Sequence, residues 1–389
     1  MTTSRPTMTH RERVLAALSH REPDRVPIDF SGNRDSSIHV VGYEKLKRRL
    51  GIEAPNIISD RMMQPVLVDE RILERFDVDT RALLPGAPDL GGDVELDETT
   101  YRDEWGVVRG KPAGNYWYDL KESVLAGEIT VRDILKHPWP DPDDPGRTRG
   151  LRQRALELKR KGDYALVLNL TIGVVHISQY LRGFQDWYTD MAADQRLIGA
   201  LMDAIVDITM AMARNIVKEV GDLADIVFTG DDLGAQGGPQ MSPEAYRKVI
   251  KPRHARFFRQ VREMCPQARI ALHTCGSVYL LLNDLIDIGV EVLNPIQVSA
   301  RDMDPARLKA EFGDRLSFWG GIDTQKVLPY GTPDDVRAEV ELRLAQMGRG
   351  GGYMLAAVHN IQPDVPVENV IAMYDHAREV GVYPLKVVP

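Results

Sequence analysis

The chain of 389 residues contains only two cysteines, Cys265 and Cys275, so a framework of disulfide bonds is excluded. No run of eighteen consecutive apolar residues occurs either, and we therefore expect no membrane-spanning helix. The 49 Lys and Arg residues are outnumbered by 57 Asp and Glu residues and form no basic stripe, which disfavours a nucleic-acid or anionic-membrane partner. Residues 1–14 are polar and basic without an apolar stretch, so we expect no signal peptide and a cytoplasmic location.

Several familiar catalytic motifs are also missing. The sequence contains no Walker phosphate loop, no GxGxxG that opens a helix after the first strand, no GxSxG elbow and no HExxH. The reaction classes that depend on these motifs therefore lose support. Hydrophobic residues make up 43% of the chain, enough for a folded core rather than a disordered chain.

Short apolar runs alternate with longer amphipathic segments along most of the chain. This alternation is typical of repeated βα units around a parallel sheet. The eight predicted strands cover residues 26–30, 80–84, 165–170, 225–229, 269–273, 292–294, 316–319 and 353–358. We therefore predict the α/β class and a (β/α)8 TIM barrel, with residues 1–389 forming a single domain.

Helix starts support this pattern. A capping residue followed by proline begins a helix well, because proline at the first helical position has no N–H to leave unbonded. Such starts predict helices over residues 245–264, 305–312 and 333–347. Asp194 similarly precedes a long helix with one apolar face, and Thr9 with Glu12 forms a capping box for a helix to Leu18.

Residues 87–162 interrupt the βα rhythm with Gly91-Gly92 and a cluster of prolines near residue 140. We interpret this stretch as an insertion after the second strand of the barrel. Long insertions of this kind often cover a site or bind a partner, although a purely structural excursion is an equal alternative.

In a TIM barrel, chemistry takes place where the strands end at the carboxyl face. His273 and Cys275 end the fifth strand, and residues two apart on an extended strand point to the same side. An imidazole and a thiolate together suit zinc, and the alternative is a hydrogen-bonded histidine beside a small buried thiol. His359, at the end of the eighth strand, favours the metal interpretation. Three protein ligands would leave one position open, as in catalytic zinc sites.

Other polar residues follow neighbouring strands. Asp231 and Asp232 come after the fourth strand. Either could be a fourth metal ligand, orient another ligand or bind substrate. The alternative is that they cap the next helix. Asn294 and Gln297 follow the sixth strand and Asp323 follows the seventh, where they would orient a polar substrate. Asn-Pro and Gly-Gly pairs in these segments are also ordinary turn residues.

Four further residues are better explained by packing. Cys265 stands at a predicted helix end and is expected to be a packed thiol. His176, Arg182 and Trp187 lie around the third βα unit and could face the mouth of the barrel, although such residues near a rim more often serve packing.

With these residues in view, the chain resembles the uroporphyrinogen decarboxylase (URO-D) superfamily over nearly its full length. The matching stretches are residues 11–18, 22–27, 228–234, 241–243, 320–325 and 362–369. The resemblance implies the barrel fold independently of the strand count.

The superfamily has two branches. In the first branch of the family that this chain resembles, the true decarboxylases use no metal and carry an Asp shortly after the second strand. They bind the propionates of their substrate with an arginine-bearing loop near the amino terminus. Here the second strand continues as Leu83-Leu84-Pro85-Gly86 without that Asp. A positive charge that develops on a pyrrole would lack its counter-charge, so porphyrinogen decarboxylation is disfavoured.

The second branch comprises zinc-dependent methyltransferases that work with corrinoid proteins, and it carries His-x-Cys-Gly after the fifth strand. Its third ligand is typically a Cys, where this chain has His359, and the decarboxylase branch also has a His in this region. The resemblance is closer to this branch, which includes O-demethylases.

We therefore expect a zinc-dependent methyltransferase that moves a methyl group between a small methylated substrate, an ether, amine or thiol, and a corrinoid (cobalamin) carried by a partner protein. The expected metal ligands are His273, Cys275 and His359. Asp231 or Asp232 would be a fourth ligand or transfer a proton. Substrate would be oriented by Asn294, Gln297 and Asp323. The alternatives are a metal-free decarboxylase on another substrate and a barrel that binds a tetrapyrrole or small ligand without turnover. The oligomeric state is left open, with a homodimer as one option.

Overall fold

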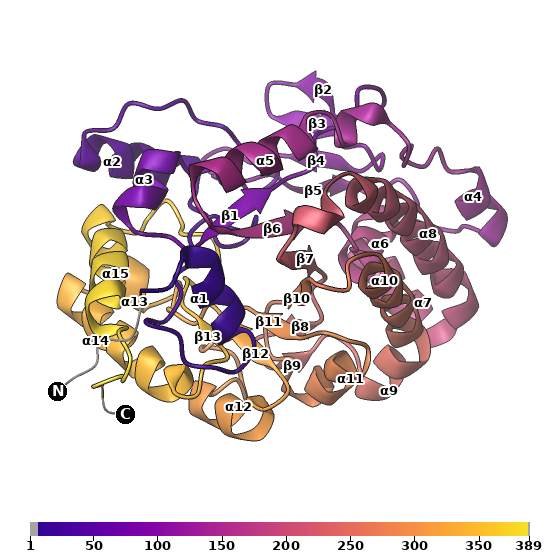
Figure 1. The fold of residues 1–389 in the computed structure, drawn as a ribbon. Coiled ribbons are helices and arrows are strands. Elements are labelled where there is room, and N and C mark those ends of the chain that lie inside the picture. Colours follow the sequence, from indigo (N-terminus) through magenta and orange to yellow (C-terminus); the bar gives the residue numbers. More distant parts are fainter. Residues whose placement is uncertain (1–6, 388–389) are drawn as a thin grey trace.

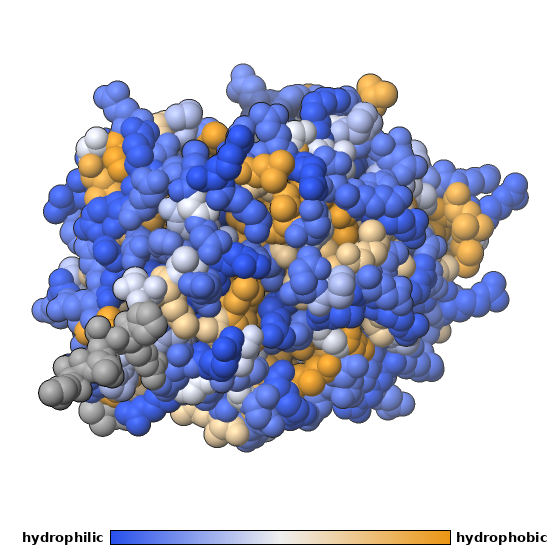
Figure 2. All heavy atoms as spheres, viewed as in Figure 1, coloured by the Kyte–Doolittle hydropathy of each residue, from blue (hydrophilic) through white to orange (hydrophobic). Residues whose placement is uncertain are grey.

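The computed structural model describes residues 7–387 (Figure 1). Residues 1–6, part of the stretch on which the signal-peptide expectation rests, lie outside the described residues. Within 7–387, no helix combines the length and the apolar character needed to cross a membrane. The face of the molecule in Figure 2 is mostly hydrophilic, with hydrophobic side chains scattered over it.

A curled parallel sheet forms the centre of the fold. In the described part of the chain it has seven strands in the order β1 (Thr80–Leu83), β6 (Ala165–Asn169), β7 (Ile226–Gly230), β10 (Arg269–His273), β11 (Val292–Asn294), β12 (Ser317–Trp319) and β13 (Tyr353–Met354). Every neighbouring pair is parallel, and each strand after β1 comes later in the sequence. This order is the one that repeated βα units produce.

Residues 26–30 lie between the two outer strands and close the barrel. The N–H of Asp29 donates to the carbonyl of Leu355 beyond β13, and the N–H of Asp79 before β1 donates to the carbonyl of Ile28, both at 2.9 Å. The pairing is too short to form a regular strand and consists of a single parallel bridge between Ile28 and Leu355. The predicted TIM-barrel fold is confirmed, with its first strand reduced to this bridge.

Helices surround the barrel (Figure 1). They are α1 (His10–Ala17), α2 (Val40–Leu50), α3 (Glu70–Arg75), α4 (Val131–Lys136), α5 (Leu151–Lys161), α6 (Val174–Arg182), α7 (Phe184–Ala193), α8 (Gln195–Val220), α9 (Pro243–Ala245), α10 (Lys251–Met264), α11 (Leu282–Asp287), α12 (Pro305–Phe312), α13 (Val327–Tyr330), α14 (Pro333–Arg343) and α15 (Val367–Val380). Short 3-10 turns cover Pro145–Arg147, Gly221–Leu223 and Tyr279–Leu281.

The predicted helix starts agree with the structure. Thr9 and Glu12 form the capping box of α1, and Asp194 caps α8. The predicted helix over residues 245–264 is not uniformly α-helical, because Pro252 has no N–H to continue the α-helical bonding. The helix is π-helical over Tyr246–Ile250 before α10 begins, and a second π-helical segment, Leu344–Gly348, follows α14.

Between β1 and α5 the chain forms a separate antiparallel sheet. Its strands are β2 (Val94–Asp97), β3 (Thr100–Arg102), β4 (Val108–Gly110) and β5 (Asp119–Glu122), joined in sequence order. A two-stranded hairpin of β8 (Gly234–Ala235) and β9 (Gly238–Pro239) follows β7.

The barrel interior is filled by alternate residues of the strands, as the strand periodicity requires. A compact cluster contains small and large side chains such as Ala165, Val167 and Trp319. Val14 and Leu18 of the α1 segment belong to the same cluster, so α1 covers the amino end of the barrel. The opposite, carboxyl end therefore holds the strand ends that the sequence analysis singled out.

Candidate metal centre

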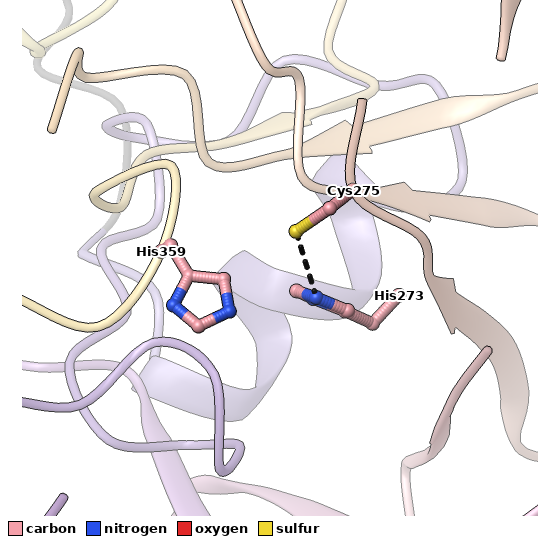
Figure 3. A group of neighbouring side chains, drawn as sticks. All are labelled: His273, Cys275 and His359. Carbon is pink, nitrogen blue, oxygen red and sulfur yellow. Dashed lines mark hydrogen bonds between the residues drawn. The ribbon is translucent and has the colours of Figure 1, made fainter. Parts of the chain in front are cut away.

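His273, Cys275 and His359 come together at the carboxyl end of the barrel. Each offers one ligand atom, and these atoms all lie within 4.8 Å of one another. The Cys275 Sγ is 3.4 Å from the His273 Nε2, and the two imidazole rings are 5.3 Å apart between centroids. Figure 3 shows the sulfur and the two rings pointing toward one another, although His359 comes from a loop 84 residues later in the chain.

The backbone after β10 explains how Cys275 reaches this position. Gly276 adopts a left-handed conformation (φ 82°), and a Cβ there would lie 2.4 Å from the carbonyl carbon of Gly234. Only glycine fits this turn. The N–H of Cys275 donates to the Asp232 Oδ1 at 2.8 Å, and that of Gly276 donates to the Gln297 Oε1 at 2.7 Å. Two side chains from other segments thus hold the backbone that carries the thiol.

The donor set fits zinc. Two imidazole nitrogens and one thiolate are borderline-soft ligands that zinc accepts, whereas magnesium and calcium prefer shells of oxygen. His273 is 5% exposed, so a bound ion would be shielded on that side from bulk water. These three residues would hold the ion and leave a position for water or substrate.

Charges within the cluster shift its titration. Burial alone would lower the pKa of His273, but the neighbouring Asp35 carboxylate and the Cys275 sulfur outweigh it and raise that pKa well above its ordinary value. Burial opposes ionisation of Cys275, yet the His273 imidazolium lowers the pKa of the thiol. The pKa of His359 is raised, since the Cys275 sulfur outweighs the effect of burial. The three side chains form one electrostatically coupled unit.

Asp35 is a member of the site that the sequence analysis missed. Its Oδ2 lies 3.6 Å from the His273 Nδ1, and its Oδ1 lies 3.9 Å from the His359 Nε2. Burial would raise the pKa of this carboxyl, but the imidazoles of His273 and His359 lower it. Asp35 follows the first barrel segment directly after Arg34, so its position past a strand end was the available signal.

Two adjoining cavities open beside the cluster. The smaller, of about 270 Å³, is lined by His273 and His359 together with Asp35, His176 and Asp232. The larger, of about 730 Å³, extends toward the antiparallel sheet. Both are lined by Arg34, Asp60, Met62, Leu170, Thr171, His176 and Tyr180. Their volumes lie near or within the range of small-molecule sites.

Arg34 is a second residue of note in both cavities. Its Nε is buried and has no hydrogen-bond partner in the described part of the chain. A guanidinium nitrogen without a hydrogen-bond partner at a cavity wall is available to an anionic group.

Asp231 lines the smaller cavity, and its carboxylate belongs to a buried hydrogen-bond network. Its carboxylate accepts hydrogen bonds from the backbone N–H groups of Val175 and His176, at the start of α6, and contacts the His254 Nε2 at 2.9 Å. The His176 Nδ1 lies 3.0 Å from the same carboxylate. Although burial opposes ionisation, His176 and His254 hold the pKa of Asp231 well below its ordinary value. The arrangement is that of a helix cap joined to two histidines.

The other four candidates lie at different distances from the cluster. Asp232 lines the smaller cavity, and its Oδ1 is 3.9 Å from the His273 Nε2. The Asn294 side chain contacts the His273 Nδ1, and the Gln297 side chain accepts the N–H of Gly276. Neither residue lines a cavity described above. Asp323 accepts the N–H of Gln325 at 2.7 Å and so caps a turn.

Three of the four residues interpreted as packing are buried away from the cavities, whereas His176 is not. The Cys265 Sγ is buried and contacts the carbonyl of Gly221 at 3.4 Å, and burial raises the pKa of this thiol to about 11. Trp187 donates from its indole to Ser178, and Arg182 pairs with Asp190. Of this group only His176 reaches the cavities.

The match to a family model decides the affiliation of the chain. Residues 123–380 match the model described as uroporphyrinogen decarboxylase (URO-D). The chain belongs to the URO-D family. This confirms the resemblance noted from the sequence motifs.

Relatives in this family carry two kinds of name. A methylcobamide:CoM methyltransferase, MtaA, of Methanosarcina barkeri is 30% identical over 172 residues, which cover 44% of this chain and 46% of the relative. The chain thus aligns with about half the length of that relative. A uroporphyrinogen decarboxylase of Methylococcus capsulatus is 24% identical, covering 96% of this chain and 98% of the relative.

A solved structure supports the fold. A methyltransferase from Methanosarcina mazei superimposes with a TM-score of 0.67 at 20% identity, covering 96% of this chain and 99% of the other. The barrel architecture therefore extends over nearly the whole of both proteins.

Proposed function

We propose that this chain is a zinc-dependent methyltransferase that moves a methyl group between a small methylated substrate and a corrinoid carried by a partner protein. The observation that carries the proposal is the cluster of His273, Cys275 and His359 at the carboxyl end of the barrel. The methyltransferases among its relatives support the same function. His359 would take the place that Cys typically has in this branch.

The roles of the residues follow from their contacts. Zinc bound to this cluster would act as a Lewis acid that polarises an ether or amine, or would hold a thiol as its thiolate. Asp35 and Asp232 face the cluster and would hold a proton or orient a bound group, while Asp231 keeps His176 in place at the cavity wall. The smaller cavity would hold the methylated substrate beside the cluster.

The proposal extends to domain organisation, partner approach and oligomeric state. The chain would act as one barrel domain over residues 1–389, in which the insertion 87–162 contributes a wall of the larger cavity. The corrinoid protein would approach from the open carboxyl end, in the cytoplasm. A homodimer is compatible with this arrangement.

Metal analysis tests the proposal directly. Purified protein dialysed against zinc should hold about one equivalent, and Cys275→Ala should lose most of it. Anomalous scattering at the zinc edge should locate the ion between the three side chains. Substoichiometric zinc in both proteins would contradict the proposal.

A second experiment tests the reaction. Cobalamin reduced to cob(I)alamin is mixed with the protein and an aryl methyl ether, methylamine or a methylated thiol. Methyl transfer should change the cobalt absorption spectrum for at least one donor, and no change for any donor would favour another chemistry.

A metal-free decarboxylase is the second candidate, favoured by the full-length similarity to the Methylococcus capsulatus enzyme. It would keep its full activity after chelation and release CO2 from a carboxylated substrate. The missing Asp after β1 and the presence of a thiol in the cluster weigh against it.

A further inference from the structure

We propose that Asn294 is a positioning residue that determines which nitrogen of His273 faces the metal cluster. The inference rests on the metal site of the proposed function and assigns Asn294 a role other than substrate binding. Asn294 is 1% exposed and is the residue opposite His273 in the pairing of β10 with β11.

The orientation of the Asn294 amide follows from its two neighbours. Its Nδ2 lies 3.3 Å from the backbone carbonyl of Trp319, and a carbonyl oxygen can only accept a hydrogen bond. The amide nitrogen must therefore face Trp319. As a result the amide oxygen, Oδ1, faces the Nδ1 of His273 at a distance of 2.7 Å.

This orientation selects the tautomer of His273. The Oδ1 of Asn294 can only accept, so the Nδ1 of His273 must carry the hydrogen. A neutral ring protonated at Nδ1 has its lone pair on Nε2, and the Nε2 is the nitrogen 3.4 Å from the Cys275 Sγ. The lone pair is thus directed toward the other ligand atoms, as metal-bound histidines require.

The support for Asn294 is rigid because it extends over three adjacent strands. The N–H of Thr274 donates to the backbone carbonyl of Asn294 at 2.7 Å, which joins the ends of β10 and β11. Trp319, at the end of β12, is fully buried and donates from its indole to the Asp29 Oδ2 at 3.0 Å. A side chain held in this way loses little further conformational freedom when a metal binds.

Zinc affinity, measured by competition with a chromophoric chelator, tests the inference. Asn294→Ala should bind zinc 10- to 100-fold more weakly than the wild type, the usual effect of losing such a partner. Asn294→Asp keeps an acceptor for the Nδ1 hydrogen but loses the hydrogen bond to Trp319, so it should bind zinc more tightly than Asn294→Ala. Asn369→Ala is the matched control, because Asn369 is equally buried and its side-chain amide donates to the carbonyls of Leu328 and Gly331, away from the cluster. Its zinc affinity should not change.

The absorption spectrum of the cobalt(II)-substituted protein gives a second readout. Its visible bands should shift in Asn294→Ala and stay unchanged in Asn369→Ala. Zinc binding by Asn294→Ala at wild-type affinity, with an unchanged cobalt spectrum, would overturn the inference and leave the proposed function intact. A wild-type protein that binds neither metal would overturn the metal site and this inference with it.

The unaltered protein offers a test that does not depend on a variant folding. In zinc-loaded protein with nitrogen-15 histidine, nuclear magnetic resonance should show His273 with hydrogen on Nδ1 and metal on Nε2. Hydrogen on Nε2 of that residue would overturn the inference.

Discussion

The two ends of the barrel use charged side chains in opposite ways. At the amino end, Asp79 is fully buried and contacts Arg13 at 2.6 Å and Arg25 at 2.7 Å, and each arginine has a further carboxylate partner. At the carboxyl end, Asp35 lies 3.6 Å from His273 and 3.9 Å from His359, and the Arg34 Nε has no partner in the described part of the chain. The buried charges at the amino end are thus paired with one another, whereas Asp35 and Arg34 at the carboxyl end can still bind a ligand.

This difference indicates a division of labour that is common in TIM barrels, in which one end stabilises the fold and the other performs chemistry. Paired buried charges are costly to disturb because removal of one partner leaves the other uncompensated. Loosely paired groups at a cavity, in contrast, are ready to bind an ion or a substrate. Substitutions at the two ends should therefore separate stability from binding.

The largest expected effect is on stability, at the amino end. Asp79→Asn leaves Arg13 and Arg25 short of one buried carboxylate and should lower the free energy of unfolding by about 3 kcal/mol. Urea unfolding of the two proteins measures this change. Asp334→Asn is the matched control, since the Asp334 side chain is 91% exposed in its pair with Arg337, and it should cost less than about 1 kcal/mol. Equal losses in both variants would contradict the division.

The next effect is on metal binding, at the carboxyl end. Cys275→Ala removes one of the three proposed ligands and should weaken zinc binding by about 100-fold, with little change in the free energy of unfolding of the metal-free protein. Isothermal titration with zinc measures the first and urea unfolding the second. Cys265→Ala serves as the control because its thiol is packed away from the cluster and should leave zinc affinity unchanged. A similar loss in both cysteine variants would contradict the assignment.

Zinc affinity should also depend on pH. The pKa values of His273 and His359 are raised, so both rings keep their protons to higher pH than ordinary histidines, and zinc must displace these protons. Affinity should therefore fall as pH falls, by about tenfold per pH unit for each proton displaced. The lowered pKa of Cys275 reduces the part of this dependence that the thiol contributes. Dissociation constants at pH 6, 7 and 8 measure the slope, and a flat profile would exclude these ligands.

The smallest effect tests the helix that covers the amino end. Thr9→Ala removes the side-chain cap of α1 and should lower the free energy of unfolding by about 1 kcal/mol. Zinc affinity should stay unchanged, because α1 lies at the end of the barrel opposite the cluster. A weaker zinc affinity in this variant would show that the two ends are coupled.

Local patterns made much of the fold predictable. The seven strands of the sheet and the helices after Asp194, Asp304 and Thr332 lie where apolar runs and capping residues placed them. The helix from Ser242 was predicted in extent but not in kind, since the π-helical turn depends on Pro252. The pairing of His273 with Cys275 was also predictable, because their spacing on a strand sets it.

Long-range contacts limited the prediction of the site. Asp231 was a candidate ligand, but its carboxylate is engaged by the start of α6, more than fifty residues away. Asp35 was missed because its approach to His273 depends on how residues 26–30 close the barrel. The position of Asp35 past a strand end marks it as a candidate, but the nearby sequence does not show which residues either carboxylate contacts.

The amino-acid sequence by itself determined the order of strands and helices, the helix caps and the pairing of His273 with Cys275 after β10, because each depends on residues within one or two turns of the chain. Only the tertiary structure decided that His359 meets this pair, that Asp35 joins them and that Asp231 binds His254 and the start of α6. The physical reason is closure of the barrel, which brings distant strand ends to one rim and cannot be read from any single segment.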